Sequence, residues 1–247
     1  DYYRGLIAGS HQLLKGDVLY AGEVVYNDGP WDVGNNYLKF NGLLRYSREY
    51  GHHSWRITAM ATHADWRATD QIPRRAFKQG LVGRFGALDP SDGGNSHRYS
   101  LTADWRMRGE NSITSVMAYG VYSKLDLFSN FSFFLDNNET TNPAGCVGLR
   151  GLPPGNRVSP ELFRTCGDQF GQPDDRWTTG FAASHTLFHT IGAFDAETTL
   201  GVQLRNDNIQ NALTKTHAQK TFGITRQDTV WVTSISPYLE NRIHWRK

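Results

Sequence analysis

This sequence has few aliphatic residues, only two cysteines and no large excess of positive or negative charge. The hydrophobic fraction is 38%, which is low for a soluble globular chain of 247 residues. The formal net charge is only +2, so no strong positive field attracts nucleic acid, and no nucleic-acid partner is expected. No apolar run reaches the roughly 18 residues that a transmembrane helix requires. These shortages disfavour a large buried core and a helical membrane anchor.

Aromatic residues, by contrast, are abundant. They make up 13% of the chain, with seven Trp and eleven Tyr. Disordered segments lack aromatics, so the low aliphatic content does not indicate disorder. Many aromatics beside few aliphatics are typical of strands that are apolar on one face only, with Trp and Tyr where the apolar region meets water.

Hydrophobic residues recur mostly with period two, the period of a β-strand. One face of the segment 98–108 carries Tyr99, Leu101, Ala103, Trp105 and Met107. The opposite face carries Arg98, Ser100, Thr102, Asp104, Arg106 and Arg108. The segments 37–48, 198–208 and 230–245 repeat this division, so each is predicted to have one apolar and one polar face.

The pattern predicts nine strands, several of them longer than ten residues. They cover about 2–13, 17–27, 37–49, 54–68, 98–108, 112–133, 176–190, 197–208 and 230–245. A strand that crosses a bilayer needs about nine to eleven residues because it is tilted, whereas a globular strand has about five or six. The connections alternate between short turns and long loops, the last long one at 209–229, as they do in bacterial membrane barrels.

The predicted fold is therefore all-β, an antiparallel up-and-down transmembrane β-barrel. A soluble β-sandwich or a lipocalin-like barrel also alternates apolar and polar residues. Two features weigh against both soluble folds. The predicted strands are too long, and the polar faces carry Arg and Asp side by side, as the wall of a water-filled lumen does.

The two cysteines, Cys146 and Cys166, lie in one loop-like segment. A disulfide that closes this loop in an oxidising compartment is the favoured interpretation. Two unpaired thiols are the alternative, because spacing alone does not determine connectivity.

Seven segments carry a resemblance to a known family. They are NDGPWDV (27–33), ADWRATDQIPRRA (64–76), GRFGALDPSDGG (83–94), RYSLTADW (98–105), LFSNFSFFLD (127–136), DQFGQPDDR (168–176) and GVQLRND (201–207). Over nearly its whole length the chain resembles the barrel domain of TonB-dependent outer-membrane receptors. The segments look like those of one subgroup, so they indicate a type of barrel and do not name a ligand.

The resemblance implies a location in the outer membrane of a Gram-negative bacterium and active import of a scarce small molecule such as a ferric siderophore or cobalamin. It implies as partners the membrane lipid, lipopolysaccharide, a plug domain and the TonB complex, and it implies no enzymatic reaction and no cofactor. Family barrels have about twenty-two strands. No segment here matches a plug domain or a TonB box, so residues 1–247 are expected to form an internal part of a barrel. A passive porin, or a structural or adhesive barrel, is the alternative function.

The predicted loop 69–97 is the first candidate site. Its cations include Arg74, Arg75, Lys78 and Arg84, which stand among aromatic residues. Clustered cations of this kind bind anionic ligands such as a ferric chelate. The favoured alternative is a solvated loop whose cations pair with lipopolysaccharide phosphates or with Asp89 and Asp92. The stretch 88–94 is rich in Asp, Pro and Gly, which predicts a turn shaped by local hydrogen bonds.

Charges on the predicted lumen-facing side of the strands are the second candidate site. They are Arg98, Asp104, Arg106, Arg108, Glu197, Arg205, Asp207, Glu240 and Arg242. One interpretation is that they contact a plug or guide a polar solute. The other is a cross-strand lattice of ion pairs that stabilises the wall.

Neither a metal site nor a catalytic centre is expected. Asp89 and Asp92 stand near other oxygen-bearing residues, but they lack the full ligand series of an EF-hand calcium loop. His185 and His189 lie on one strand about 13 Å apart, too far to share one ion. No G-x-S-x-G nucleophile elbow occurs in the chain.

Overall fold

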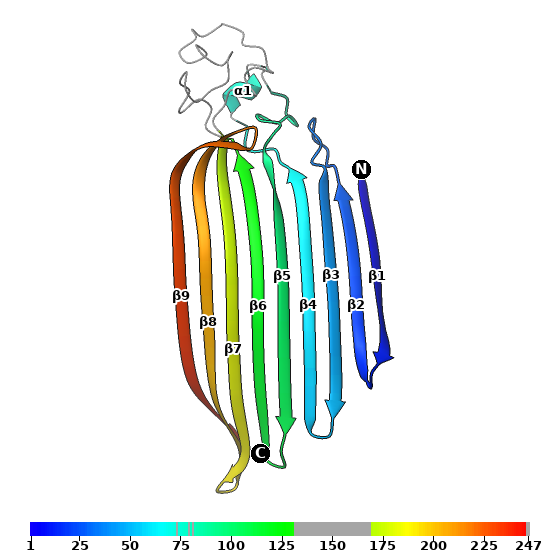
Figure 1. Ribbon diagram of the computed structural model, residues 1–247, viewed down its shortest axis with the longest axis vertical. Coiled ribbons are helices and arrows are strands. Elements are labelled where there is room, and N and C mark those ends of the chain that lie inside the picture. Colours follow the sequence, from blue (N-terminus) through cyan, green and yellow to red (C-terminus); the bar gives the residue numbers. More distant parts are fainter. Residues whose placement is uncertain (73, 79, 81, 131–168, 246–247) are drawn as a thin grey trace.

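The computed structural model describes residues 1–245 with the exception of 73, 79, 81 and 131–168. One antiparallel sheet holds nine strands in chain order, an up-and-down meander in which β1 and β9 form the two edges (Figure 1). The strands are β1 (Tyr2–Leu13), β2 (Gly16–Asn27), β3 (Tyr37–Tyr50), β4 (His53–Arg67), β5 (Gly93–Arg108), β6 (Ser112–Ser129), β7 (Gln169–Ile191), β8 (Phe194–His217) and β9 (Lys220–His244). The predicted strand number and strand order are confirmed.

Connections at the two ends of the sheet differ in length. At the end that we call the turn end, the connections are the short segments 14–15, 51–52, 109–111 and 192–193. At the opposite end, the loop end, lie the connections 28–36 and 68–92 and the turn 218–219. A short helix, α1 (Arg74–Lys78), lies within 68–92. No helix among the described residues is long and apolar enough to cross a membrane.

The prediction of a long loop at 209–229 is wrong. β8 and β9 continue through this segment and are joined by a two-residue turn, Ala218 and Gln219, both with positive φ (47° and 65°). Strand pairing runs on from Ile209 opposite Val230 to His217 opposite Lys220. Polar residues stand on both faces here, so the alternation that marks a half-buried strand disappears while the backbone pairing continues.

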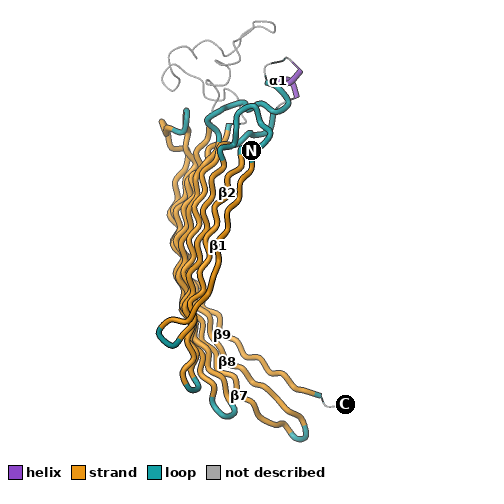
Figure 2. The backbone as a smooth tube through the Cα atoms, turned by 90° about the vertical axis from the view of Figure 1, so that its right-hand side faces the viewer, coloured by secondary structure: helices purple, strands orange, loops and turns teal. Residues whose placement is uncertain are grey.

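The sheet is curved, with its polar residues on the inner side. Residues in register on neighbouring strands share a face, and one such row runs from Asp104 through Met117 and Ala182 to Gln203. A hollow of about 810 Å³ opens on this face and is lined by residues of β2 to β7, of β9 and of two turns, from Lys15 to Tyr238. Figure 2 shows the sheet almost edge-on, with the lower ends of β7, β8 and β9 bent to one side.

Buried apolar side chains are concentrated at the loop end. Ala76, Val82 and Leu88 form a small core there, and Ile72 packs against it. The sheet, in contrast, leaves large apolar side chains exposed; Leu101, for example, is 56% exposed. The described residues of 68–92 therefore fold as a compact unit, which we call the cap, on the loop end of a sheet whose described strands form no buried apolar cluster.

Two tyrosines of the inner side lie over glycines of the neighbouring strand. A Cβ added to Gly201 would lie 2.3 Å from Cζ of Tyr238, and a Cβ added to Gly180 would lie 2.2 Å from Cζ of Tyr119. An aromatic ring that covers a glycine replaces the packing that the missing side chain would provide. These pairs bind β6 to β7 and β8 to β9 on the inner side.

We expect Gly201→Val to lower the free energy of unfolding by about 1–3 kcal/mol, because the new methyl groups displace the ring of Tyr238. Gly120→Val is the matched control, since nothing lies within 4 Å of a Cβ at this position. Valine also favours strands, so the control is expected to be neutral. Urea unfolding of both variants in detergent micelles checks this; equal losses would contradict the role of Tyr238.

Candidate functional site

The charged residues predicted to face a lumen lie on the inner side of the sheet, which we call the polar face. They are Arg98, Asp104, Arg106 and Arg108 on β5, Glu197, Arg205 and Asp207 on β8, and Glu240 and Arg242 on β9. Alternation within each strand and register between strands place all of them on this one face. Their role in lining a lumen stays a prediction.

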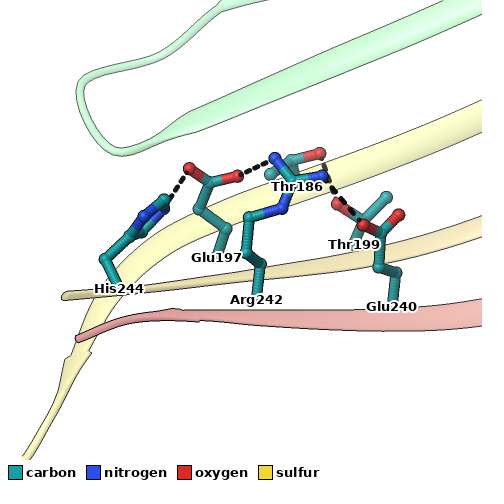
Figure 3. Close-up of polar contacts among 6 residues, drawn as sticks. All are labelled: Thr186, Glu197, Thr199, Glu240, Arg242 and His244. Atoms are coloured by element: carbon teal, nitrogen blue, oxygen red, sulfur yellow. Dashed lines mark hydrogen bonds and ion pairs between the residues drawn. The ribbon is translucent and has the colours of Figure 1, made fainter. Parts of the chain in front are cut away.

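Near the turn end, β8 and β9 carry a network of ion pairs (Figure 3). Arg242 lies between two carboxylates: its Nη1 is 3.5 Å from Oε2 of Glu197 and its Nη2 is 3.1 Å from Oε1 of Glu240. Nε2 of His244 lies 2.9 Å from Oε1 of Glu197. Thr186 and Thr199 continue this polar surface on β7 and β8 with hydroxyl groups 2.8 Å apart.

A second network lies nearer the middle of the polar face. Arg205 donates from Nε and Nη2 to the two oxygens of Asp207 at 2.7 and 3.0 Å. The hydroxyl of Thr178, on β7, donates to the same carboxylate at 2.7 Å. Asp207 is only 8% exposed, so its carboxylate is held by both partners in a largely desolvated position. Arg205 and Asp207 both lie on β8, so this ion pair runs along one strand, and Thr178 supplies the contact from the neighbouring strand.

The sequence reasoning missed a third network, on β1 to β3. Glu23 accepts from Nε of Arg4 at 2.6 Å and from Nδ2 of Asn41 at 2.7 Å. The signal was present in the alternation of the segments 2–13 and 17–27, whose faces were not separated. The polar face therefore carries charge across the whole width of the sheet.

The charges of β5 are arranged differently. None of Arg98, Asp104, Arg106 and Arg108 forms an ion pair with another described residue, although Asp104 stands directly opposite Arg56 on β4. The hollow on the polar face has six cationic residues and three acidic ones in its lining: Lys15, Arg45, Arg48, Arg56, Arg106 and Arg108 against Asp17, Glu49 and Asp104. This excess of positive charge favours anions over cations in the hollow.

Arg242 and Asp207 are expected to differ in their contribution to stability. Arg242→Gln should change the free energy of unfolding by less than about 1 kcal/mol, because the side chain is 60% exposed and exposed ion pairs contribute little. Asp207→Ala should cost about 2–3 kcal/mol, because it leaves Thr178 and Arg205 without their acceptor. Urea unfolding of both variants checks this, and a larger loss for Arg242→Gln would contradict it.

Aromatic side chains mark both borders of the opposite face, which we call the apolar face. Toward the loop end they are Tyr3, Tyr26, Tyr99, Tyr122, Trp177 and Trp231; toward the turn end they are Tyr46, Trp55, Trp105 and Trp245. Ring contacts join several neighbours, among them Tyr122 and Trp177 at 4.9 Å. The next row toward the loop end is polar, with His63, His97 and Lys124 in register.

At the loop end, a buried polar cluster ties the cap to the sheet. Gln169, 1% exposed at the start of β7, donates to Oδ1 of Asp92 and Oγ of Ser91, each at 3.0 Å. Its Oε1 accepts from the hydroxyl of Thr216 at 3.1 Å and from the backbone N–H of Gln219 at 2.8 Å. One side chain thereby links the cap to β7 and to the β8–β9 hairpin.

Asp89 and Asp92 shape the end of the cap. Oδ1 of Asp89 accepts from the backbone N–H of Ser91 at 2.9 Å, which confirms the predicted local turn. Burial raises the pKa of Asp92 to about 8; the amide of Gln169 lowers it, while the nearby Asp89 raises it further. Gly93 follows with φ of +145°, where a Cβ would meet the carbonyl oxygen of Trp66 at 2.2 Å, so only glycine allows this close return to β4.

The cations predicted to capture a ligand are spread over the cap. Arg74 and Lys78 are exposed on α1, and Arg84 is exposed on a separate turn. Among the described residues none of these three forms an ion pair. Arg75 lies in α1, and its side chain is outside the described part of the structure, as are Cys146 and Cys166. The predicted anion site and the predicted disulfide stay predictions.

In the described part of the chain, no three His, Cys, Asp or Glu side chains are grouped to hold a metal ion. His185 and His189 each contact a threonine hydroxyl instead, at 2.9 and 2.8 Å.

Comparison with known proteins identifies a fold. No protein-family profile and no curated protein sequence matches the chain. A solved structure of the ferric citrate transporter FecA in its unliganded form matches with a TM-score of 0.69 at 8% sequence identity. The match covers 98% of this chain and 32% of FecA, so the chain spans about a third of that protein. The chain therefore has the fold of a part of a transmembrane β-barrel wall.

Proposed function

We propose that this chain forms part of the wall of an outer-membrane receptor that imports a scarce ligand, such as a ferric siderophore or cobalamin, with energy from TonB. The observation that carries the proposal is the division of one long-stranded sheet into an apolar face with aromatic borders and a charged polar face. The fold shared with the ferric citrate transporter supports it.

The apolar face has the dimensions of a membrane-facing band. On β5 it runs from Tyr99 to Met107, roughly 27 Å along the strand at about 3.4 Å per residue, which is about 19–22 Å of height at the usual strand tilt of about 35–45°. The apolar band of an outer-membrane barrel is about 25 Å tall and is bordered by aromatic girdles. The polar row of His63, His97 and Lys124 begins where such a band ends, at the headgroup level. Lys124 and the cap cations would face lipopolysaccharide phosphates there.

The polar face fits an interior filled by water or by a plug domain. Lipid does not tolerate so many charges, whereas a lumen does. The excess of cations in the hollow near the turn end favours an acidic plug segment or an anionic solute at this level of the wall. The exposed cap, with Arg74 and Lys78, is then the surface that meets the ligand first.

Growth and uptake experiments test this function. A strain that lacks the full-length protein should grow poorly when one ligand class is limiting, and we would compare iron starvation, cobalamin limitation and carbohydrate limitation. Uptake should stop when TonB is deleted or the proton gradient is collapsed. Uptake that persists without TonB, together with steady conductance in planar lipid bilayers, would indicate a passive porin instead. Loss of adhesion without any loss of uptake would indicate a structural or adhesive barrel.

A further inference from the structure

Two carboxylates at the base of the cap are buried, and no cation among the described residues neutralises them. Asp89 and Asp92 are 6% and 1% exposed, and Oδ2 of Asp70 lies 3.3 Å from the backbone nitrogen of Asn130 beside them. None of the three aspartates forms an ion pair with a described Lys, Arg or His. A buried carboxylate is normally paired with a cation or bound to a metal, because removing a charge from water is costly.

Two buried oxygens in the same place have no hydrogen-bond partner. They are Oδ2 of Asp92 and Oδ1 of Asn130. Asn130 is 2% exposed, and its Nδ2 donates to Oδ2 of Asp89 at 3.0 Å, so its amide group points into the acidic cluster. Buried acceptors without donors are rare, and two of them among carboxylates indicate a positively charged ligand.

We propose that this cluster binds Ca²⁺ through the carboxylates of Asp89 and Asp92 and the amide oxygen of Asn130. Ca²⁺ takes about six to eight oxygen ligands in a flexible geometry, so carboxylate, amide and water oxygens suit it. Mg²⁺ requires a near-ideal octahedron, which ligands from separate chain segments rarely provide. In the structure the amide nitrogen of Asn130 faces Asp89, and a half-turn of the amide would bring its oxygen there, where a cation between the two oxygens would stabilise it.

Calcium at this position would fasten the cap to the sheet. Asp89 and Asp92 belong to the cap, whereas Asn130 follows β6, and Gln169 joins Asp92 to β7 and β8.

Isothermal titration of the full-length protein in detergent with CaCl₂, after removal of metals with EGTA, tests the site. We expect Ca²⁺ binding with a Kd of about 10⁻⁴–10⁻³ M, which is typical of extracellular sites. Asp92→Asn and Asn130→Ala should each weaken binding at least about tenfold. Asp32→Asn, which changes an exposed aspartate of the neighbouring loop 28–36, is the control and should bind as the wild type does. MgCl₂ should bind more weakly.

Absence of Ca²⁺ binding in the wild type, or equal binding in Asp92→Asn, would overturn the proposal. Limited proteolysis of the wild type provides a readout that does not depend on how the variants fold. CaCl₂ should slow cleavage within 68–92 relative to EGTA, and unchanged cleavage would also overturn the site. Neither experiment measures transport, so a negative result leaves the proposed import function standing.

Discussion

Leu101→Arg is expected to lower the free energy of unfolding by about 2–4 kcal/mol, the cost of an arginine near the midplane on the lipid side of a barrel. Leu101 is 56% exposed on the apolar face of β5, between Tyr99 and Trp105. In water this exposure would be unfavourable for leucine, and arginine would be tolerated. In hydrocarbon the order is reversed, so the sign of the effect reports which medium contacts this face.

Thr102→Arg is the matched control for Leu101→Arg. Thr102 is the next residue of β5 and lies on the polar face, in register with Thr58 and Tyr119. A new arginine there enters the charged interior, and we expect a change below about 1 kcal/mol. Equilibrium urea unfolding in lipid vesicles, with the fraction of assembled protein as a second readout, measures both. Equal effects, or a larger one at Thr102, would show that the apolar face is not the lipid face.

The second large effect concerns pH and Asp92. Its pKa is raised to about 8 in the folded protein, against 3.8 as the ordinary value. The folded state therefore keeps its proton up to about pH 8, while the unfolded state releases it near pH 4. The folded state binds more protons between these values, so the free energy of unfolding falls as pH rises through this window. The carboxylates of Asp70 and Asp89 increase the effect, and no described cation opposes it.

We expect this loss to be on the order of 3–5 kcal/mol across the window when Ca²⁺ is removed with EGTA. Asp92→Asn, which resembles the protonated side chain, should abolish this part of the pH dependence, whereas Asp32→Asn should retain it. Hydrogen exchange of the amides in 68–92, followed from pH 5 to pH 8, measures the local effect. If Asp92→Asn shows the same pH-dependent loss of protection as the wild type, the assignment to Asp92 is wrong.

Alternation along the chain predicted the strands well wherever one face is apolar. The bounds of β1 to β4 differ from the prediction by one residue at most, because apolar and polar side chains alternate to both ends of these strands. The same reasoning failed for the upper parts of β7, β8 and β9, which carry polar residues on both faces. Backbone pairing extends these strands beyond the apolar face, and the periodicity of the side chains does not reveal this extension.

For the candidate sites, too, the sequence predicted the local features and missed those that depend on contacts between strands. Sequence placed nine charged residues on polar faces, and it could do so because the direction of a strand side chain follows from its position in the chain. It did not show that Arg242 on β9 pairs with Glu197 on β8, since cross-strand partners depend on register. It predicted the turn at Asp89, a local feature, and expected no metal site around Asp92.

The sequence by itself therefore determined the strand number, the strand order and the two unlike faces of this protein, since all three follow from local periodicity and from short connections between neighbours. Only the tertiary structure decided the curvature, the pairing of charges and the cluster of Asp92, Asn130 and Gln169. These three residues are separated by dozens of positions in the chain. They meet because strands of unequal length end together under the cap, and the cost of burying their oxygens exists only once they have met.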